Sequence, residues 1–232
     1  MAMTFAPESA INFGDPALFE EMENFTVSAW IYPTGWGTNS FGRIISKEND
    51  PSEGWLFYVN NSTATSTFNF YIYRFFSDGI AIAANNSISL STWQHVAATY
   101  TSAAIKLYVN GVEPSYESNT AGSGILEGDT FTDLVVGNNE DYARGFDGRI
   151  EDVRIYNRVL TPAEIGGLYM AKGHDSNWTG LILRCPMREY PAGVNIGSNQ
   201  LQDLTENKNH GTSRYTTTPF SEGIIVPRRR IA

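Results

Sequence analysis

The chain has 232 residues, 41% of them hydrophobic and 18% charged, which is enough for one large domain with a sizeable core. Its formal net charge of −9 argues against general binding to nucleic acid, and no apolar run is long enough to cross a membrane. The 21 glycines, with many Ser, Thr and Asn, indicate short strands and many turns.

The two ends of the sequence and its single cysteine bear on the compartment. The first residues, "MAMTFAPESAINFGDP", lack the basic stretch and apolar run of a signal peptide, so we expect synthesis and folding in a cytoplasm. Cys185 has no partner for an intramolecular disulfide and is expected to pack as a small hydrophobe. The basic run Arg228, Arg229 and Arg230 is either a solvated tail or a contact for an acidic partner surface.

Alternating apolar residues predict β-strands along most of the chain. In "FTVSAWIYP", Phe25, Val27, Ala29 and Ile31 share one face of the expected strand. Further strands are predicted, in chain order, over residues 54–60, 67–76, 92–101, 104–111, 133–138 and 145–157. The Asn110-Gly111 step predicts a type I′ hairpin turn.

The strand over residues 145–157 breaks simple alternation. Ile150 falls on one face, whereas Val153 and Ile155 fall on the other. One extra residue in a strand reverses the parity of everything after it. We therefore predict a β-bulge near Glu151 and Asp152.

One short helix is predicted in "TPAEIGGLYMAKG". Thr161 is a suitable N-cap, Pro162 suits the first helical position, Glu164 completes a capping box, and Gly173 can end the helix. Regularly spaced strands with a single helix predict an all-β fold, an antiparallel β-sandwich of two sheets.

The motifs "FTVSAWIYP", "RIISK", "GWLFYV", "WQHVAATY", "LYVNG" and "FDGRIEDVRIYNRVLTPAEIGGLY" occur in the order typical of one family. From Ala10 to Lys172 the chain resembles a laminin G-like domain of the concanavalin A-like lectin/glucanase superfamily. The resemblance implies an antiparallel jelly roll of two large curved sheets with one short helix.

The segment after the helix resembles the usual beginning of such a domain. "GLILRCPM", residues 180–187, resembles the first strand of family members, and "DLTENKNHGT" resembles the turn that follows it. We therefore expect residues 1–172 to form the body, and residues 173–232 to supply the missing strand and a basic arm. The order suggests a circular permutation, with a strand swap to a neighbouring copy as the alternative.

Glucanases of the superfamily carry paired carboxylates on one face of a strand, which makes Glu151 and Asp152 a candidate pair. Here the acids are adjacent, so they lie on opposite faces or in a bulge, and no third carboxylate follows at the needed spacing. We predict that they are structural and that the protein is not an enzyme. His95 and His210 are also expected to be structural.

Calcium is the one cofactor that the resemblance suggests, because laminin G-like domains often hold Ca²⁺ near a sheet edge. The candidate ligands are Asp147, Asp203 and Asn209. No dense acidic loop is present, so a turn stabilised by side-chain hydrogen bonds explains these residues equally well.

Aromatic side chains are the candidate ligand contacts. Trp36 lies in a Gly-rich loop, where it either stacks on a sugar or packs against the sandwich. Tyr71, Tyr73 and Tyr142 carry the same two alternatives.

These features predict a non-catalytic, lectin-like structural protein. We expect a bacteriophage virion component, such as a capsid decoration or tail protein, whose partners are other copies, virion proteins and surface glycans. No nucleic acid or membrane insertion is expected. The alternative is a carbohydrate-binding or adhesion module that works outside the cell or at its surface.

Overall fold

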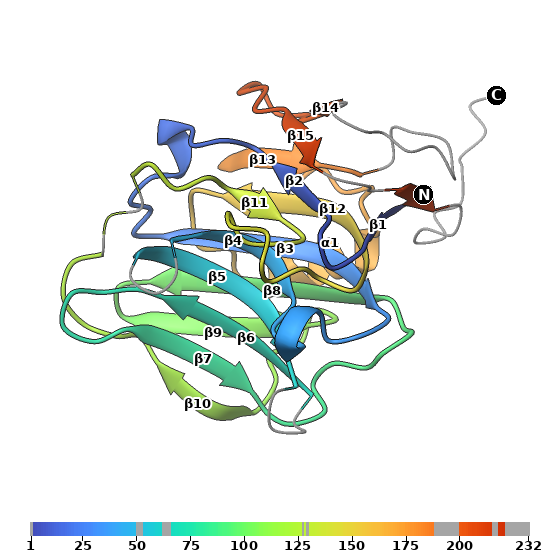
Figure 1. Ribbon diagram of the computed structural model, residues 1–232. Helices are drawn as coiled ribbons and strands as arrows, with labels where there is room; N and C mark the ends of the chain where they lie inside the picture. The colour runs from blue at the N-terminus through green and yellow to red at the C-terminus, as the bar shows by residue number, and fades with distance from the viewer. Residues whose placement is uncertain are drawn as a thin grey trace.

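The computed structural model describes residues 2–49, 53–61, 66–126, 128, 130–187, 200–214 and 218–220. They form two antiparallel sheets that stack face to face (Figure 1). This arrangement is the predicted β-sandwich. The predicted basic contact Arg228–Arg230 lies outside the described residues. Among those described, no helix is long and apolar enough to span a bilayer.

The first sheet has seven strands in the order β16-β1-β12-β3-β8-β9, with β13 also pairing to β12. Its strands are β1 (Ala2–Phe5), β3 (Phe25–Pro33), β8 (Gln94–Thr101), β9 (Ala104–Val109), β12 (Gly148–Tyr156), β13 (Leu181–Cys185) and β16 (Thr218–Phe220).

The second sheet has nine strands in the order β10-β7-β6-β5-β4-β11-β2-β15-β14. Its strands are β2 (Ala10–Asn12), β4 (Arg43–Asn49), β5 (Glu53–Asn60), β6 (Thr67–Ile72), β7 (Gly79–Ala83), β10 (Tyr116–Thr120), β11 (Val135–Val136), β14 (Gln200–Leu201) and β15 (Gly211–Arg214). Two short 3-10 helices, η1 (Ala17–Phe19) and η2 (Thr38–Ser40), lie in loops, and the α-helix is α1 (Pro162–Ala171).

The main core fills the space between the two sheets. The predicted inward face of β3, Phe25, Val27, Ala29 and Ile31, is fully buried there, and Cys185 joins the same cluster. A smaller cluster packs α1 onto the outer face of the seven-stranded sheet. It consists of Ala97, Tyr108, Tyr156, Leu160, Ile165, Leu168 and Leu181.

The predicted bulge in β12 is confirmed. The pairing of β12 with β3 shifts register between Glu151 and Arg154, and Asp152 adopts a positive φ of 51°. As a result Ile150, Val153 and Ile155 all reach the same core. The extra residue therefore reconciles the broken alternation of the sequence.

The predicted helix and hairpin are also confirmed. Thr161 caps α1 and Glu164 completes the capping box, and the chain leaves the helix through left-handed conformations at Lys172 and Gly173. Asn110 and Gly111 both have positive φ between β9 and the bridge that follows it, as a type I′ turn requires. The strand predicted over residues 67–76 is shorter, because β6 ends at Ile72.

One edge of β12 is divided between two strands from distant parts of the chain. β1 pairs with the beginning of β12, where Met3 lies opposite Ile150. β13 pairs with the end of β12, where Cys185 lies opposite Val153. Residues 181–185 thus pair within the sandwich of their own chain, and the circular permutation inferred from element order stays a prediction.

Candidate functional site

A groove lies on the outer face of the nine-stranded sheet, away from the core. It has a volume of about 290 Å³ and is lined by Phe41, Arg43, Leu56, Tyr58, Tyr71, Tyr73 and Arg144. β5 forms its floor, because Leu56 and Tyr58 alternate with Trp55, Phe57 and Val59, which point into the core. Leu56 and Tyr58 are 5% and 7% exposed, so the aromatic surface of the groove comes mainly from Tyr71 and Tyr73.

The floor of the groove is held by a buried ion pair. Arg43 donates from Nε to Glu48 Oε1 at 2.5 Å and from Nη2 to Glu48 Oε2 at 3.2 Å. Its guanidinium carbon also lies 5.0 Å from the centre of the Tyr58 ring. Burial raises the pKa of Tyr58 to about 12, although the charge of Arg43 opposes the shift. Tyr58 therefore keeps its hydroxyl proton at neutral pH.

Tyrosines and a second arginine form the walls. The Tyr71 and Tyr73 rings meet edge to face with centres 4.9 Å apart, and the Tyr71 hydroxyl donates to Asp78. On the other wall, the guanidinium carbon of Arg144 lies 5.7 Å from the centre of the Phe41 ring. Aromatic faces beside hydrogen-bonding groups suit a ligand with both apolar faces and hydroxyls.

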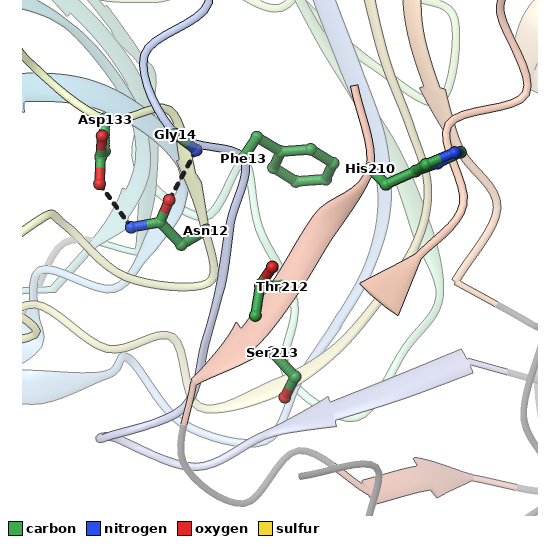
Figure 2. Close-up of a pocket in the computed structure, with 7 residues that line it drawn as sticks. All are labelled: Asn12, Phe13, Gly14, Asp133, His210, Thr212 and Ser213. Carbon is green, nitrogen blue, oxygen red and sulfur yellow. Dashed lines mark hydrogen bonds between the residues drawn. The ribbon is translucent and has the colours of Figure 1, made fainter. Parts of the chain in front are cut away.

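A second, more polar cavity of about 500 Å³ lies where β2 and β15 pair (Figure 2). Asn12 Nδ2 donates to Asp133 Oδ2 at 2.7 Å, and Asn12 Oδ1 accepts from the Gly14 backbone at 2.6 Å. The aromatic side chain that lines this cavity, Phe13, is only 6% exposed. The cavity thus offers little aromatic surface for stacking.

The predicted ligand contacts fall in different places. Tyr71 and Tyr73 line the groove. Tyr142 does not line it, and its hydroxyl lies 3.3 Å from Asn12 Nδ2 beside the second cavity. Trp36 is half-buried and packs against the main core.

The three candidate calcium ligands lie in loops. Asp147 accepts a 2.8 Å hydrogen bond from Thr34 Oγ1. Asp203 is buried, and its Oδ2 accepts a 3.0 Å hydrogen bond from the backbone N–H of Asn209. In the described part of the chain, no group of three or more His, Cys, Asp or Glu residues is placed to hold a metal ion.

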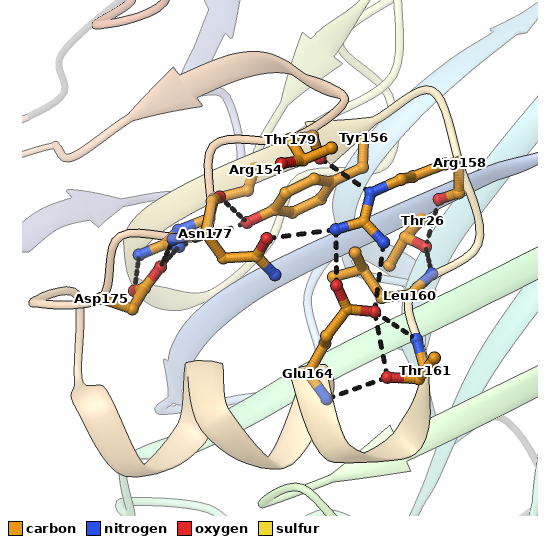
Figure 3. Close-up of polar contacts among 10 residues, drawn as sticks. All are labelled: Thr26, Arg154, Tyr156, Arg158, Leu160, Thr161, Glu164, Asp175, Asn177 and Thr179. Carbon is orange, nitrogen blue, oxygen red and sulfur yellow. Dashed lines mark hydrogen bonds and ion pairs between the residues drawn. The ribbon is translucent and has the colours of Figure 1, made fainter.

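The acidic pair of β12 is buried. Glu151 is fully buried, and Asp152 accepts from Arg154 Nη2 at 2.6 Å and from Arg184 Nε at 3.2 Å. Arg154 in turn donates to Asp175 in the segment after α1 (Figure 3). Both acids therefore belong to the framework of the fold.

Five groove residues were not predicted from the sequence: Phe41, Arg43, Leu56, Tyr58 and Arg144. The parity of "GWLFYVN" already separates Leu56 and Tyr58 from the core residues of the same strand. Arg144 and Phe41 come from loops, and only the folded chain brings them beside β5.

A family model described as the concanavalin A-like lectin/glucanases superfamily matches residues 6–166. The chain belongs to this superfamily. Adhesion G-protein coupled receptor V1 of Danio rerio is 27% identical over 154 residues, which are 64% of this chain and 2% of the receptor. The chain therefore corresponds to a small part of that relative.

Solved structures share the fold of this superfamily member. A candidate carbohydrate-binding protein from Bacteroides ovatus ATCC 8483 superposes with a TM-score of 0.68 at 17% identity, over 95% of this chain and 60% of that one. Domain 4 of AbnA, a GH43 extracellular arabinanase from Geobacillus stearothermophilus, was solved with arabinotriose. It has a TM-score of 0.52 at 21% identity, over 72% of this chain and 76% of that domain.

Proposed function

We propose that this protein is a non-catalytic carbohydrate-binding module that holds glycans in the outer groove. The observation that carries the proposal is the pair of partly exposed rings, Tyr71 and Tyr73, which line the groove together with Arg144. Tyr58 and Arg43 are buried and form the floor beneath them. Sugar rings combine apolar faces with hydroxyl groups, so aromatic rings and nearby donors recognise them together. The carbohydrate named with the Geobacillus domain supports the same class of ligand.

The proposal is tested on an array of immobilised plant, fungal, bacterial and animal glycans. We expect binding by the wild type, and a loss of about tenfold or more in affinity for Tyr71→Ala and Tyr73→Ala. Phe131→Ala is the matched control, because this ring is 89% exposed and does not line the groove. A blank array, or a loss equal to that of the control, contradicts the proposal.

The virion role predicted from the sequence stays a second proposal, together with partners among virion proteins. One part of its support is the terminal arm with the basic run Arg228–Arg230, which lies outside the described residues. If this run docks the protein on a particle, replacing the three arginines should reduce incorporation into particles and leave glycan binding unchanged. The alternative is that the protein works as a binding module outside the cell or at its surface.

We also infer a circular permutation of the element order. Its support is that β13 pairs with β12 and β15 pairs with β2 within one chain. A rearranged gene that encodes residues 173–214 ahead of residues 2–172, through a flexible linker, should yield a folded protein. An aggregated product, beside a soluble parent, would count against the inference.

A further inference from the structure

Three large apolar side chains are exposed together just beyond the end of β6. Phe75 is 63% exposed, Phe76 is 78% exposed, and Ile125 on the neighbouring loop is 76% exposed. The two phenylalanine rings meet edge to face with centres 5.1 Å apart. Apolar groups gathered on the surface of a folded protein commonly mark a binding site.

The two loops that carry these side chains are hydrogen-bonded to each other. The Phe75 N–H donates to Ile125 O at 3.0 Å, and the Ser123 N–H donates to Ser77 O at 2.8 Å. Arg74 reinforces the pairing, because its Nε donates to Gly124 O at 3.1 Å. The apolar tip is therefore presented on a backbone ladder, which lowers the entropic cost of binding.

The tip continues one wall of the groove. Tyr73 still pairs with β5 through its N–H, which donates to Gly54 O at 2.9 Å. The next side chain, Arg74, turns toward the seven-stranded sheet, where Nη1 donates to the Tyr100 hydroxyl at 2.8 Å. Phe75 follows two residues after Tyr73, in a bend that begins after the bridge between Arg74 and Leu126, so the apolar tip adjoins the Tyr73 end of the groove. At about 3.3 Å per extended residue, Tyr71 and Phe75 are separated by roughly 13 Å of chain at most.

Charge in the loop that carries Phe75 and Phe76 is neutralised locally. The charged side chains of the segment 73–78 are Arg74 and Asp78. Arg74 is bonded as described, and Asp78 accepts from the Tyr71 hydroxyl and, at 3.0 Å, from the Arg74 N–H. An uncharged ligand surface therefore suits this end of the groove best.

We propose that Phe75, Phe76 and Ile125 form a further subsite, so that the ligand is a linear polysaccharide segment of several sugar rings lying along β6. The inference rests on the proposed function of the groove. A second copy of the chain is a poorer occupant on two grounds. Three such side chains bury roughly 500 Å² at most, whereas a stable interface needs about 800 Å² per partner. The net charge of −9 also opposes self-association.

The test measures affinity against chain length. Arabino-, xylo-, manno- and cello-oligosaccharides, from disaccharide to octasaccharide, are titrated calorimetrically into the wild type, Phe75→Ala/Phe76→Ala and Tyr71→Ala. For the oligosaccharide series that binds, we expect the affinity of the wild type to increase with chain length beyond the trisaccharide. The double variant should lose about tenfold for the octasaccharide and nothing for the trisaccharide, whereas Tyr71→Ala should weaken both.

Phe76→Ala alone and Phe131→Ala complete the set. Phe76 is the most exposed of the three, so its truncation leaves the fold intact and should give a smaller loss confined to long chains. Wild-type length dependence in the double variant overturns the subsite and spares the groove. Failure of every oligosaccharide series and of the glycan array overturns the groove and the subsite together. Binding to phosphatidylcholine vesicles and self-association are measured as well. If the double variant loses either of these and keeps wild-type glycan binding, the tip serves another partner and the subsite is wrong.

Discussion

Arg154 Nη2 lies 2.7 Å from Asp175 Oδ2, which ties the middle of β12 to the segment that follows α1. Both side chains are largely buried, and Arg154 also pairs with Asp152. Removing one partner of a buried ion pair leaves the other charge uncompensated. Burial alone would raise the pKa of Asp175, but the hydrogen bond and charge of Arg154 outweigh it and lower that pKa.

Asp175→Asn should lower the free energy of unfolding by about 3 kcal/mol at neutral pH, measured by urea denaturation. Lys106→Gln is the control, because it removes the exposed pair with Glu113 and should cost less than about 1 kcal/mol. The difference between wild type and Asp175→Asn should shrink as the pH falls below about 4, where the unfolded carboxylate takes up a proton. Equal losses for the two variants would refute the role of the buried pair.

His95 should make the protein less stable as the pH falls from 6.5 toward 4. Burial lowers its pKa to about 4, and the charge of Arg154 adds to the shift. In that pH range the unfolded chain binds a proton that the folded chain does not bind, so acid favours unfolding by up to about 3 kcal/mol. His95→Gln should flatten this part of the stability profile. An unchanged slope in the variant would contradict the assignment.

Glu164 should stabilise the start of α1 in a pH-dependent way. The hydrogen bond from Arg158 lowers its pKa to about 2, against the effect of burial, and the bonds to Thr161 assist. This stabilisation is complete above the unfolded pKa near 4.5 and is lost as the pH falls toward 2. Glu164→Gln should therefore cost about 1 kcal/mol at pH 7 and almost nothing at pH 2, by chemical denaturation. A cost that persists at pH 2 would point to lost packing instead.

Asp203 distinguishes a calcium site from a hydrogen-bonded turn. Its Oδ1 accepts from the backbone of Arg184 and Thr205 at 3.0 and 2.9 Å, and its Oδ2 accepts from Thr205 Oγ1 and the Asn209 backbone at 2.7 and 3.0 Å. We therefore expect equal melting temperatures in EDTA and in calcium chloride. Asp203→Ala should cost about 2–3 kcal/mol in both. A calcium-dependent rise that this variant abolishes would establish the ion.

The acidic pair of β12 should have no catalytic role. Glu151 and Asp152 are 0% and 3% exposed, so neither reaches a glycosidic bond. Wild-type protein incubated with β-glucan should release no reducing ends above background. The double variant Glu151→Gln/Asp152→Asn should lower the stability of the fold and leave the background release of reducing ends unchanged. Turnover that the double variant loses would prove the pair catalytic.

Features encoded by neighbouring residues could be predicted from the sequence. The inward face of β3, the bulge at Asp152, the capping box of Thr161 and Glu164, and the turn at Asn110 depend on local parity or local hydrogen bonds. The strands β1, β2, β10 and β16 were not predicted, because they are short and pair only with strands distant in sequence. β7, β14 and β15 were also not predicted, although each pairs with a strand next to it in sequence, because they have only two to five residues.

The candidate site was only partly predictable for the same reason. Tyr71 and Tyr73 share a strand and its extension, and their aromatic character was visible at once. Arg144 reaches the groove from a loop that is far from β5 in sequence, so no local pattern places it there. Trp36 was a predicted ligand contact, but its half-buried ring packs against the core, a contact that no local pattern in its Gly-rich loop indicates.

The divided edge of β12 has a consequence for synthesis on the ribosome. β1 is translated before its partner β12, whose residues 148–150 emerge much later. The other half of that edge stays open until residues 181–185 follow. Until then the nascent chain carries exposed strand edges, which favour pairing with other chains. Folding should therefore be slow, dominated by contacts distant in sequence, and helped in cells by chaperones that shield the early strands.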